Sequence, residues 1–237
     1  MTASHRHATI VFDLDGTLVD TAPDLLAAAD NVFTQRNLKQ TIPADQIKPW
    51  ISYGARRMIT EGLKIANETT TETEVDTMLD DFLVHYEANI ANNSRPFPGI
   101  LNALGVLRSR GCKLAVCTNK RETLTLALLE ALNMTHHFDA IAARDTLSVC
   151  KPDPGHLFGA VEMAGGSPHH AVMIGDSSVD IETASAANVP SIGVTFGYSQ
   201  VPIQQTNPTV VLDTYDNLIN EIDALLSRTI DNVVTLK

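Results

Sequence analysis

Short apolar runs alternate with amphipathic stretches along most of this 237-residue chain. Six of the runs have the near-continuous apolar character of strands that are buried on both faces of a parallel sheet. They are residues 9–12, 113–118, 139–143, 171–175, 191–196 and 209–212. Helical patterns at residues 99–111, 122–133, 154–165 and 179–188 each end at Gly or Asn, as helices often do. The alternation predicts an α/β fold, a doubly wound (Rossmann-like) parallel sheet covered by helices.

The segment from residue 21 to residue 96 interrupts this alternation, because it contains no convincing strand pattern. Residues 20–37 and 71–90 instead carry apolar side chains at the i, i+3, i+4, i+7 spacing of amphipathic helices. Two prolines in the stretch RPFPG at residues 95–99 mark the return to the alternating pattern. We therefore predict an all-helical insert at residues 20–96 within a core domain formed by residues 1–19 and 97–237. An insert at this point would lie over the carboxyl ends of the strands, where open α/β sheets bind ligands.

Composition and charge narrow the class of protein. The chain is 44% hydrophobic and 19% charged, which is ordinary for a globular protein. A net charge of −11 argues against a nucleic-acid backbone or an anionic membrane as the main partner. The first ten residues lack an apolar signal region, and no run of about 18 apolar residues occurs. The three cysteines, Cys112, Cys117 and Cys150, are interpreted as buried, reduced thiols, so we expect a cytoplasmic protein.

The stretch FDLDGTLVD at residues 12–20 places three acids directly behind the first predicted strand. Two carboxylates held about 4 Å apart repel each other by roughly 4 kcal/mol at an effective dielectric constant near 20. Exposed acids avoid this cost by spreading into water, but acids fixed at the end of a buried strand cannot. A positive charge is therefore expected between them.

Three further polar stretches also follow predicted strands: TNK at residues 118–120, KPDP at 151–154 and GDSSVD at 175–180. Together the four stretches supply carboxylates, a hydroxyl, an amide and an ammonium group. The residues are Asp13, Asp15, Asp176 and Asp180, Thr118, Asn119, and Lys151. Because Mg²⁺ prefers oxygen ligands, this combination suits Mg²⁺ together with a phosphoryl group.

These motifs, D-x-D-G-T, T-N, K-P and G-D-x-x-x-D in this order, resemble those of the haloacid dehalogenase superfamily of phosphohydrolases. The resemblance covers nearly the whole chain, and the helical insert is similar to the α-helical cap domain of one subclass. Among these relatives the motif stretches are most similar to those of phosphoglycolate phosphatases. The resemblance implies a Mg²⁺-dependent phosphate monoester hydrolase that acts through an aspartyl-phosphate intermediate on a small phosphorylated metabolite.

The resemblance also implies a role for each matched residue. Asp13 would be the nucleophile, and Asp15 would act as general acid and then general base, with a raised pKa supplied by a neighbouring carboxylate. Thr118 and Lys151 would bind the phosphoryl oxygens, and Asn119 would contact the substrate. The metal ligands would be Asp13, the backbone carbonyl of Asp15, Asp176, and Asp180 as an outer ligand or a partner of Lys151.

Neighbouring residues have simpler structural interpretations. Asp20 and Asp24 are interpreted as acids that favour the positive end of a helix dipole. Gly16 and Gly175 are interpreted as residues that permit tight turns.

The loop WISYGARRM at residues 50–58 matches the point where phosphoglycolate phosphatases usually carry a glycine-rich W-x-G-x-G-A. Ser52 and Tyr53 make the loop bulkier here, which leaves the identity of the substrate more open than the reaction type. Arg56 lies at a predicted helix start above the site, where its guanidinium could meet a substrate carboxylate. An ordinary surface position for Arg56 is equally consistent with the sequence.

Other functions stay open at this point. The substrate could instead be a sugar phosphate such as N-acetylmuramic acid 6-phosphate, or the protein could be a hexose-phosphate mutase of the same fold. A non-enzymatic phospho-signalling module is disfavoured, because response-regulator receivers are about half this length and their nucleophile does not follow the first strand. We expect a monomer or a homodimer.

Overall fold

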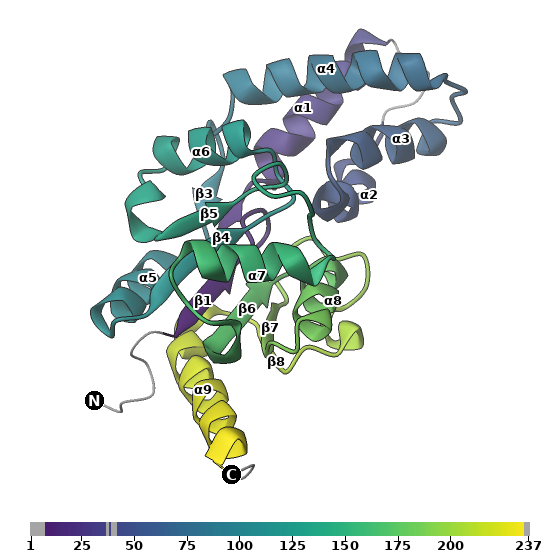
Figure 1. Cartoon of the computed structure of the whole chain (residues 1–237). Helices are drawn as coiled ribbons and strands as arrows, with labels where there is room; N and C mark the ends of the chain where they lie inside the picture. The colour runs from purple at the N-terminus through teal and green to yellow at the C-terminus, as the bar shows by residue number, and fades with distance from the viewer. Residues whose placement is uncertain (1–7, 37, 39–41, 235–237) are drawn as a thin grey trace.

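The computed structural model describes residues 8–36, 38 and 42–234, with side chains up to residue 227. Its main sheet has six parallel strands in the order β5-β4-β1-β6-β7-β8, so the first strand is central (Figure 1). The strands are β1 (Thr9–Phe12), β4 (Lys113–Cys117), β5 (Ala140–Ala142), β6 (Ala171–Gly175), β7 (Ser191–Val194) and β8 (Val210–Leu212). All six lie within the predicted strand segments, and the α/β fold class predicted from the sequence is confirmed.

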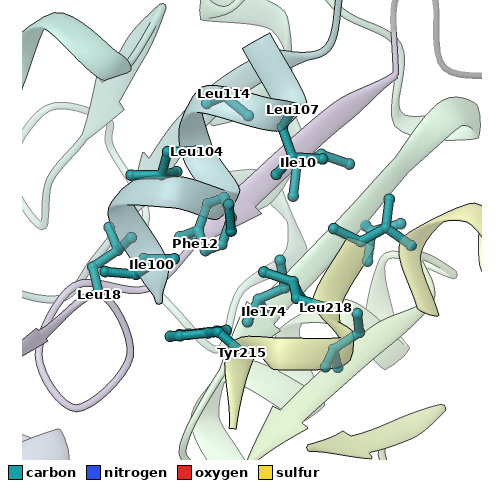
Figure 2. Packing of buried hydrophobic residues seen from close by; sticks show 14 of the residues in the cluster. Ile10, Phe12, Leu18, Ile100, Leu104, Leu107, Leu114, Ile174, Tyr215 and Leu218 are labelled. Atoms are coloured by element: carbon teal, nitrogen blue, oxygen red, sulfur yellow. The ribbon is translucent and has the colours of Figure 1, made fainter. Parts of the chain in front are cut away.

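Helices cover both faces of this sheet. They are α5 (Ile100–Ser109), α6 (Glu122–Ala131), α7 (Pro154–Met163), α8 (Ser178–Ala186) and α9 (Leu218–Val234). Ile10 and Phe12 of β1 pack into one hydrophobic cluster with side chains of α5, α6 and α9, and Figure 2 shows both pointing toward α5. Val11 points to the opposite face, where it packs with α7 and α8. This alternation on a strand buried on both sides fixes the end of β1 in the middle of the molecule.

Helices also form the insert between the first two predicted core strands. Its elements are α1 (Ala22–Gln35), α2 (Ala44–Ile47), a 3₁₀ turn at Lys48–Tyr53, α3 (Ala55–Ile65) and α4 (Glu72–Ala88). Apolar side chains from these helices, among them Phe33, Met58 and Phe82, form a second hydrophobic cluster, which Leu124 and Tyr198 of the core join. The four helices gather at one end of the sheet (Figure 1). The helical insert predicted from the sequence is therefore confirmed, with its chain ends at the carboxyl side of β1.

Several elements were not predicted. A two-residue strand β2 (Val19–Asp20) pairs antiparallel with β3 (Arg95–Pro96), which corrects the prediction of no strand between residues 21 and 96. This pair joins the two points at which the chain enters and leaves the insert. Helix α9 at the carboxyl end was also missed. The predicted end of the first helix at residue 37 and the segment 1–7 lie outside the described residues.

Asp24 at the start of α1 has a larger structural role than the sequence indicated. Its carboxylate is 2% exposed and accepts hydrogen bonds from the backbone N–H groups of Asn93 and Ser94, and from the Ser94 hydroxyl at 2.6 Å. Burial acts to raise the pKa of Asp24, but the hydrogen bonds from Ser94 and Asn93 outweigh it and lower that pKa. Asp24 is thus a buried link between the two ends of the insert, and not only a helix-start acid.

We expect Asp24→Asn to lower the free energy of unfolding by about 2–4 kcal/mol at pH 7, because charge-assisted hydrogen bonds are lost and an amide faces buried donors. Since the pKa is lower in the folded chain, the carboxylate contributes stability that is fully present above the unfolded pKa of about 3.9. That contribution is lost as the pH falls through the folded value. Urea unfolding at pH 7 and pH 3 checks this, with Asp30→Asn on the exposed face of α1 as the control. An unchanged difference at pH 3 would contradict the assignment.

The cysteines follow the prediction in part. Cys112 and Cys117 are buried on opposite faces of the sheet, and burial raises the pKa of the Cys117 thiol to about 12. Cys150 is only half-buried, which corrects the prediction that all three are buried. None of the helices in the part of the chain that the structure describes is long and apolar enough to cross a membrane.

Candidate active site

The predicted chemical residues meet at the carboxyl ends of the central strands. Asp13 and Asp15 follow β1, Thr118 and Asn119 follow β4, and Asp176 follows β6. The loop after β5 adds Lys151, and α8 adds Asp180. Most of them line one pocket of about 620 Å³, which also has a wall formed by the insert. This size is within the range of small-molecule sites in enzymes.

Lys151 lies between two of the acids. Its ammonium group is buried and donates to Asp13 Oδ1 at 2.7 Å and to Asp180 Oδ1 at 2.6 Å. The other oxygen of Asp180 accepts from the backbone N–H and the hydroxyl of Ser177, which forms a capping box at the start of α8. Asp180 is therefore the partner of Lys151, one of the two positions that the sequence left open for it.

Asp176 is fully buried and is held by different donors. Its Oδ2 accepts from the backbone N–H of Tyr198 at 2.6 Å, and its Oδ1 lies 3.4 Å from the Thr17 hydroxyl. Gly16 has a φ of +84°, and a Cβ at this position would lie 2.5 Å from Asp176 Oδ2. Gly175 does not have a positive φ, but a Cβ there would collide with the Asp180 side chain. The turn interpretation therefore holds for Gly16, whereas Gly175 is needed for the space that it leaves.

Electrostatics show what this crowding costs the acids. Burial raises the pKa of Asp13 to about 7, with Lys151 opposing the rise and Asp180 adding to it. Burial, Asp180 and Asp13 raise the pKa of Asp176 well above its usual range. Burial alone would lower the pKa of Lys151, but the two carboxylates beside it raise that pKa, so the group stays an ammonium. The protein alone therefore does not fully compensate the negative charge of these buried acids.

A divalent cation fits this cluster of acids. One carboxylate oxygen each from Asp13, Asp176 and Asp180 lies within 4.8 Å of the others, and all three residues are buried. Oxygen donors in a tight group are the set that Mg²⁺ prefers, and a bound cation would favour their ionised forms. The Asp15 carboxylate is not part of this group. The expected role of the Asp15 backbone carbonyl as a metal ligand stays a prediction.

The loop that carries Lys151 is fixed by hydrogen bonds to a residue that the sequence analysis missed. His156 is buried, its Nδ1 accepts from the Lys151 backbone N–H at 3.1 Å, and its Nε2 lies 3.1 Å from the Ala143 carbonyl. Because the backbone N–H can only donate, Nε2 carries the proton. Burial and the Lys151 charge lower the pKa of His156 to about 4, so the ring is neutral near pH 7. The Asn119 amide adds a bond to the Lys151 carbonyl at 2.9 Å.

Thr118 and Asn119 present further polar atoms to the pocket. The Thr118 hydroxyl is buried and accepts from the backbone N–H of Lys120 at 3.2 Å, so it can still donate a hydrogen bond. The Asn119 Oδ1 atom is buried and has no hydrogen-bond partner among the described residues. The Thr118 hydroxyl is therefore available to a bound molecule, and contact of Asn119 with the substrate stays a prediction.

A second buried lysine contacts Asp15 and was not assigned from the sequence. Lys120 Nζ donates to both oxygens of Asp15, at 3.0 and 3.3 Å, and to the Tyr86 hydroxyl at 2.8 Å. The charged group in contact with Asp15 is thus an ammonium and not the neighbouring carboxylate that the sequence analysis expected. Tyr86 belongs to α4, so this contact joins the insert to the core.

The insert wall contains the loop that the sequence analysis singled out. Ser52, Tyr53 and Arg56 all line the pocket. The Arg56 guanidinium, however, binds the carboxylates of Glu72 and Asp76 on α4, and its side chain is 44% exposed. These two partners could not be inferred from the sequence, because their approach depends on how α3 packs against α4. Arg56 therefore lies where predicted, but with its charge already balanced.

The chain is similar to known proteins in both sequence and structure. Residues 10–194 match the haloacid dehalogenase-like hydrolase family. The chain is 42% identical over 219 residues to a phosphoglycolate phosphatase of Mesorhizobium japonicum, over 92% of this chain and 96% of that protein. It is 41% identical to a phosphoglycolate phosphatase of Agrobacterium fabrum, over 91% and 92% of the two chains. The crystal structure of a predicted phosphoglycolate phosphatase from Haemophilus somnus is similar with a TM-score of 0.85 and 29% identity, over 92% of this chain and 99% of that one.

Proposed function

The chain belongs to the haloacid dehalogenase-like hydrolase family, and on that premise we propose that it is a Mg²⁺-dependent phosphatase that hydrolyses 2-phosphoglycolate. The observation that carries the proposal is that Asp13, Asp15 and Lys151 line the same pocket, beside a cluster of acids that fits a cation. The names of relatives that are 34–42% identical over most of the chain support the choice of substrate.

Asp13 is the nucleophile in this proposal. Its carboxylate oxygen attacks phosphorus in line, and the bond to the leaving alkoxide breaks, which leaves the phosphoryl group on Asp13. Thr118 and Lys151 donate hydrogen bonds to the phosphoryl oxygens, where charge is spread in a loose transition state. Asp15 protonates the departing oxygen. It then takes a proton from a water molecule, whose oxygen attacks phosphorus and releases phosphate and the Asp13 carboxylate.

Asp13, Asp176 and the backbone carbonyl of Asp15 would hold Mg²⁺. Asp180 would lie further out, because both of its oxygens accept hydrogen bonds of 3.1 Å or shorter, whereas among the described residues Asp176 Oδ1 has only the Thr17 hydroxyl at 3.4 Å. When bound, the cation offsets the charge of the acids and of the substrate phosphate. The residues of the chain meanwhile keep the geometry: Lys151 holds Asp13 from one side, and the Tyr198 backbone holds Asp176.

The proposed domain division follows the sequence prediction, with a cap domain at residues 20–96 and a core domain at residues 1–19 and 97–237. The hydrophobic cluster formed mainly by the insert and the β2–β3 pair at its base support this division. A small phosphorylated metabolite as the ligand, a cytoplasmic location and a monomeric or dimeric state stay predictions.

A panel of phosphate monoesters tests the proposed substrate. Phosphoglycolate, hexose phosphates and N-acetylmuramic acid 6-phosphate are ranked by kcat/KM in the presence of Mg²⁺. We expect phosphoglycolate to rank first and chelator to abolish turnover. A sugar phosphate in first place would replace the substrate but keep the reaction. Isomerisation of a hexose phosphate without net phosphate release would indicate a mutase, and a single burst of phosphate would indicate a signalling module.

Arg56 is the residue that we propose to meet the substrate carboxylate. To do so, its guanidinium would release the carboxylates of Glu72 and Asp76 and bind the substrate carboxylate instead. Such exposed ion pairs contribute only about 0–1 kcal/mol to stability. A contact with a carboxylate in a closed pocket contributes about 1.5–3 kcal/mol. We therefore expect Arg56→Ala to lower kcat/KM for phosphoglycolate by about tenfold and to leave p-nitrophenyl phosphate, which has no carboxylate, nearly unchanged.

The matched control for this variant is Arg36→Ala. Arg36 also pairs with an α4 carboxylate, Glu74, but it does not line the pocket. A loss of activity on both esters, or on neither, would show that Arg56 does not contact the substrate carboxylate.

A further inference from the structure

We infer that Lys120 is a positioning residue that orients the carboxylate of Asp15 for proton transfer and links it, through the Tyr86 hydroxyl, to helix α4 of the insert. This inference rests on the proposed function, because it concerns the proton transfers that Asp15 performs there. No motif singled out in the sequence includes a role for Lys120 or for Tyr86.

The hydrogen bonds of Lys120 favour orientation of Asp15 over direct contact with a substrate. Its ammonium has three acceptors: Asp15 Oδ1 at 3.0 Å, Asp15 Oδ2 at 3.3 Å and the Tyr86 hydroxyl at 2.8 Å. An ammonium has three N–H donors, so these acceptors match its full capacity. Because both oxygens of Asp15 are engaged, the plane of this carboxylate is fixed as well as its distance.

Burial makes the arrangement rigid. The Lys120 side chain is 6% exposed, and a buried ammonium requires partners. Burial opposes its charge, but Asp15 and Tyr86 raise the pKa of Lys120, so it stays charged. Burial raises the pKa of Tyr86 to about 12, so this hydroxyl keeps its proton. Its oxygen accepts the hydrogen bond from Lys120.

The main chain of Lys120 is fixed to other parts of the site. Its N–H donates to the Thr118 hydroxyl at 3.2 Å, and its carbonyl accepts from the Arg144 backbone at 3.0 Å. Lys120 therefore connects three groups: the proposed phosphoryl-binding Thr118, the proposed acid Asp15, and Tyr86 on the insert. It follows that the position of the acid depends on the seating of α4 over the core.

The test compares three esters whose leaving groups differ. The leaving groups of phosphoglycolate and glycerol phosphate are alkoxides that need a proton, and only phosphoglycolate has a carboxylate. The leaving group of p-nitrophenyl phosphate is a stabilised phenolate, so its departure depends little on a general acid. We expect Lys120→Met to lower kcat/KM about tenfold to a hundredfold on both alkyl esters and less on p-nitrophenyl phosphate.

Two further variants separate positioning from folding. Tyr86→Phe removes only a hydroxyl from a packed ring and should give the same pattern with a smaller loss. Lys120→Arg keeps the charge and should recover part of the loss. The matched control is Lys113→Met, which removes an exposed ammonium paired with Asp139 at the opposite end of β4 and should leave all three rates unchanged.

A double-mutant cycle gives the deciding result. If Lys120 acts through Asp15, Lys120→Met should cause no further loss in the Asp15→Asn background. An equal loss in both backgrounds, or an equal loss on all three esters, would overturn the inference in favour of a purely structural role. A loss on phosphoglycolate alone would overturn it in favour of direct carboxylate binding. A wild-type enzyme inactive on all three esters would overturn the proposed function, and the inference with it.

Discussion

Asp13→Asn is expected to lower kcat by at least about a thousandfold on every phosphate ester, because the amide cannot attack phosphorus. The substitution is nearly isosteric, and Lys151 keeps its contact with Asp180, so we expect the fold to persist. Rapid quenching of the wild-type enzyme with a labelled ester should show label on Asp13, and the variant should show none. Thermal unfolding of both proteins separates lost chemistry from lost structure.

The control for this variant is Asp213→Asn. Asp213 also follows a strand of the main sheet, β8, but it is exposed and lies outside the pocket. Its rate should equal that of the wild type. Near-normal turnover of Asp13→Asn would contradict the assignment of the nucleophile. Near-normal turnover of the wild type in excess chelator would contradict the need for a cation.

The central part of the fold was predictable, because strands that are buried on both faces require a recognisable run of apolar residues. A parallel strand covered on both faces, such as β1, needs consecutive apolar residues, and Ile10, Val11 and Phe12 provide them. The β2–β3 pair could not be found in this way, because two residues are too few to show a period. Helix α9 could have been found: Leu218, Ile222 and Leu225 have the i, i+4, i+7 spacing and are buried.

In the candidate site, too, some residues were predictable from the sequence and others were not. Asp13, Thr118 and Asp176 directly follow strands, so their meeting at one edge of the sheet follows from topology. His156 has its hydrogen-bond partners on the nearby residues Lys151 and Ala143, but no pattern in the sequence singles it out. Lys120 could not be assigned, because its role depends on contacts between distant segments. Tyr86 lies 34 positions before Lys120, and only the packing of the insert brings them together. The same limit explains Arg56, whose partners on α4 became visible only in the folded structure.

Asp15→Asn is expected to separate proton transfer from nucleophilic attack. The Asp15 carboxylate lines the pocket but lies outside the cluster of oxygens that fits a cation, so its loss should leave the nucleophile and the proposed metal site intact. A positioned acid contributes about 10²–10⁴-fold to departure of an alkoxide. We therefore expect kcat/KM for phosphoglycolate to fall within that range, and kcat/KM for p-nitrophenyl phosphate to fall much less.

The choice of kinetic constant decides how clearly this result can be interpreted. Both esters pass through the same phosphoryl group on Asp13, and its hydrolysis also needs Asp15 as a base. When that shared step limits turnover, kcat of the variant should become equal for the two esters, while kcat/KM, which reports the steps up to departure of the leaving group, stays different. Equal losses in kcat/KM on both esters would show that Asp15 does not protonate the leaving group. In the part of the chain that the structure describes, the Asp15 side chain is held only by Lys120, so the size of this difference sets the largest loss that Lys120→Met can cause through the acid.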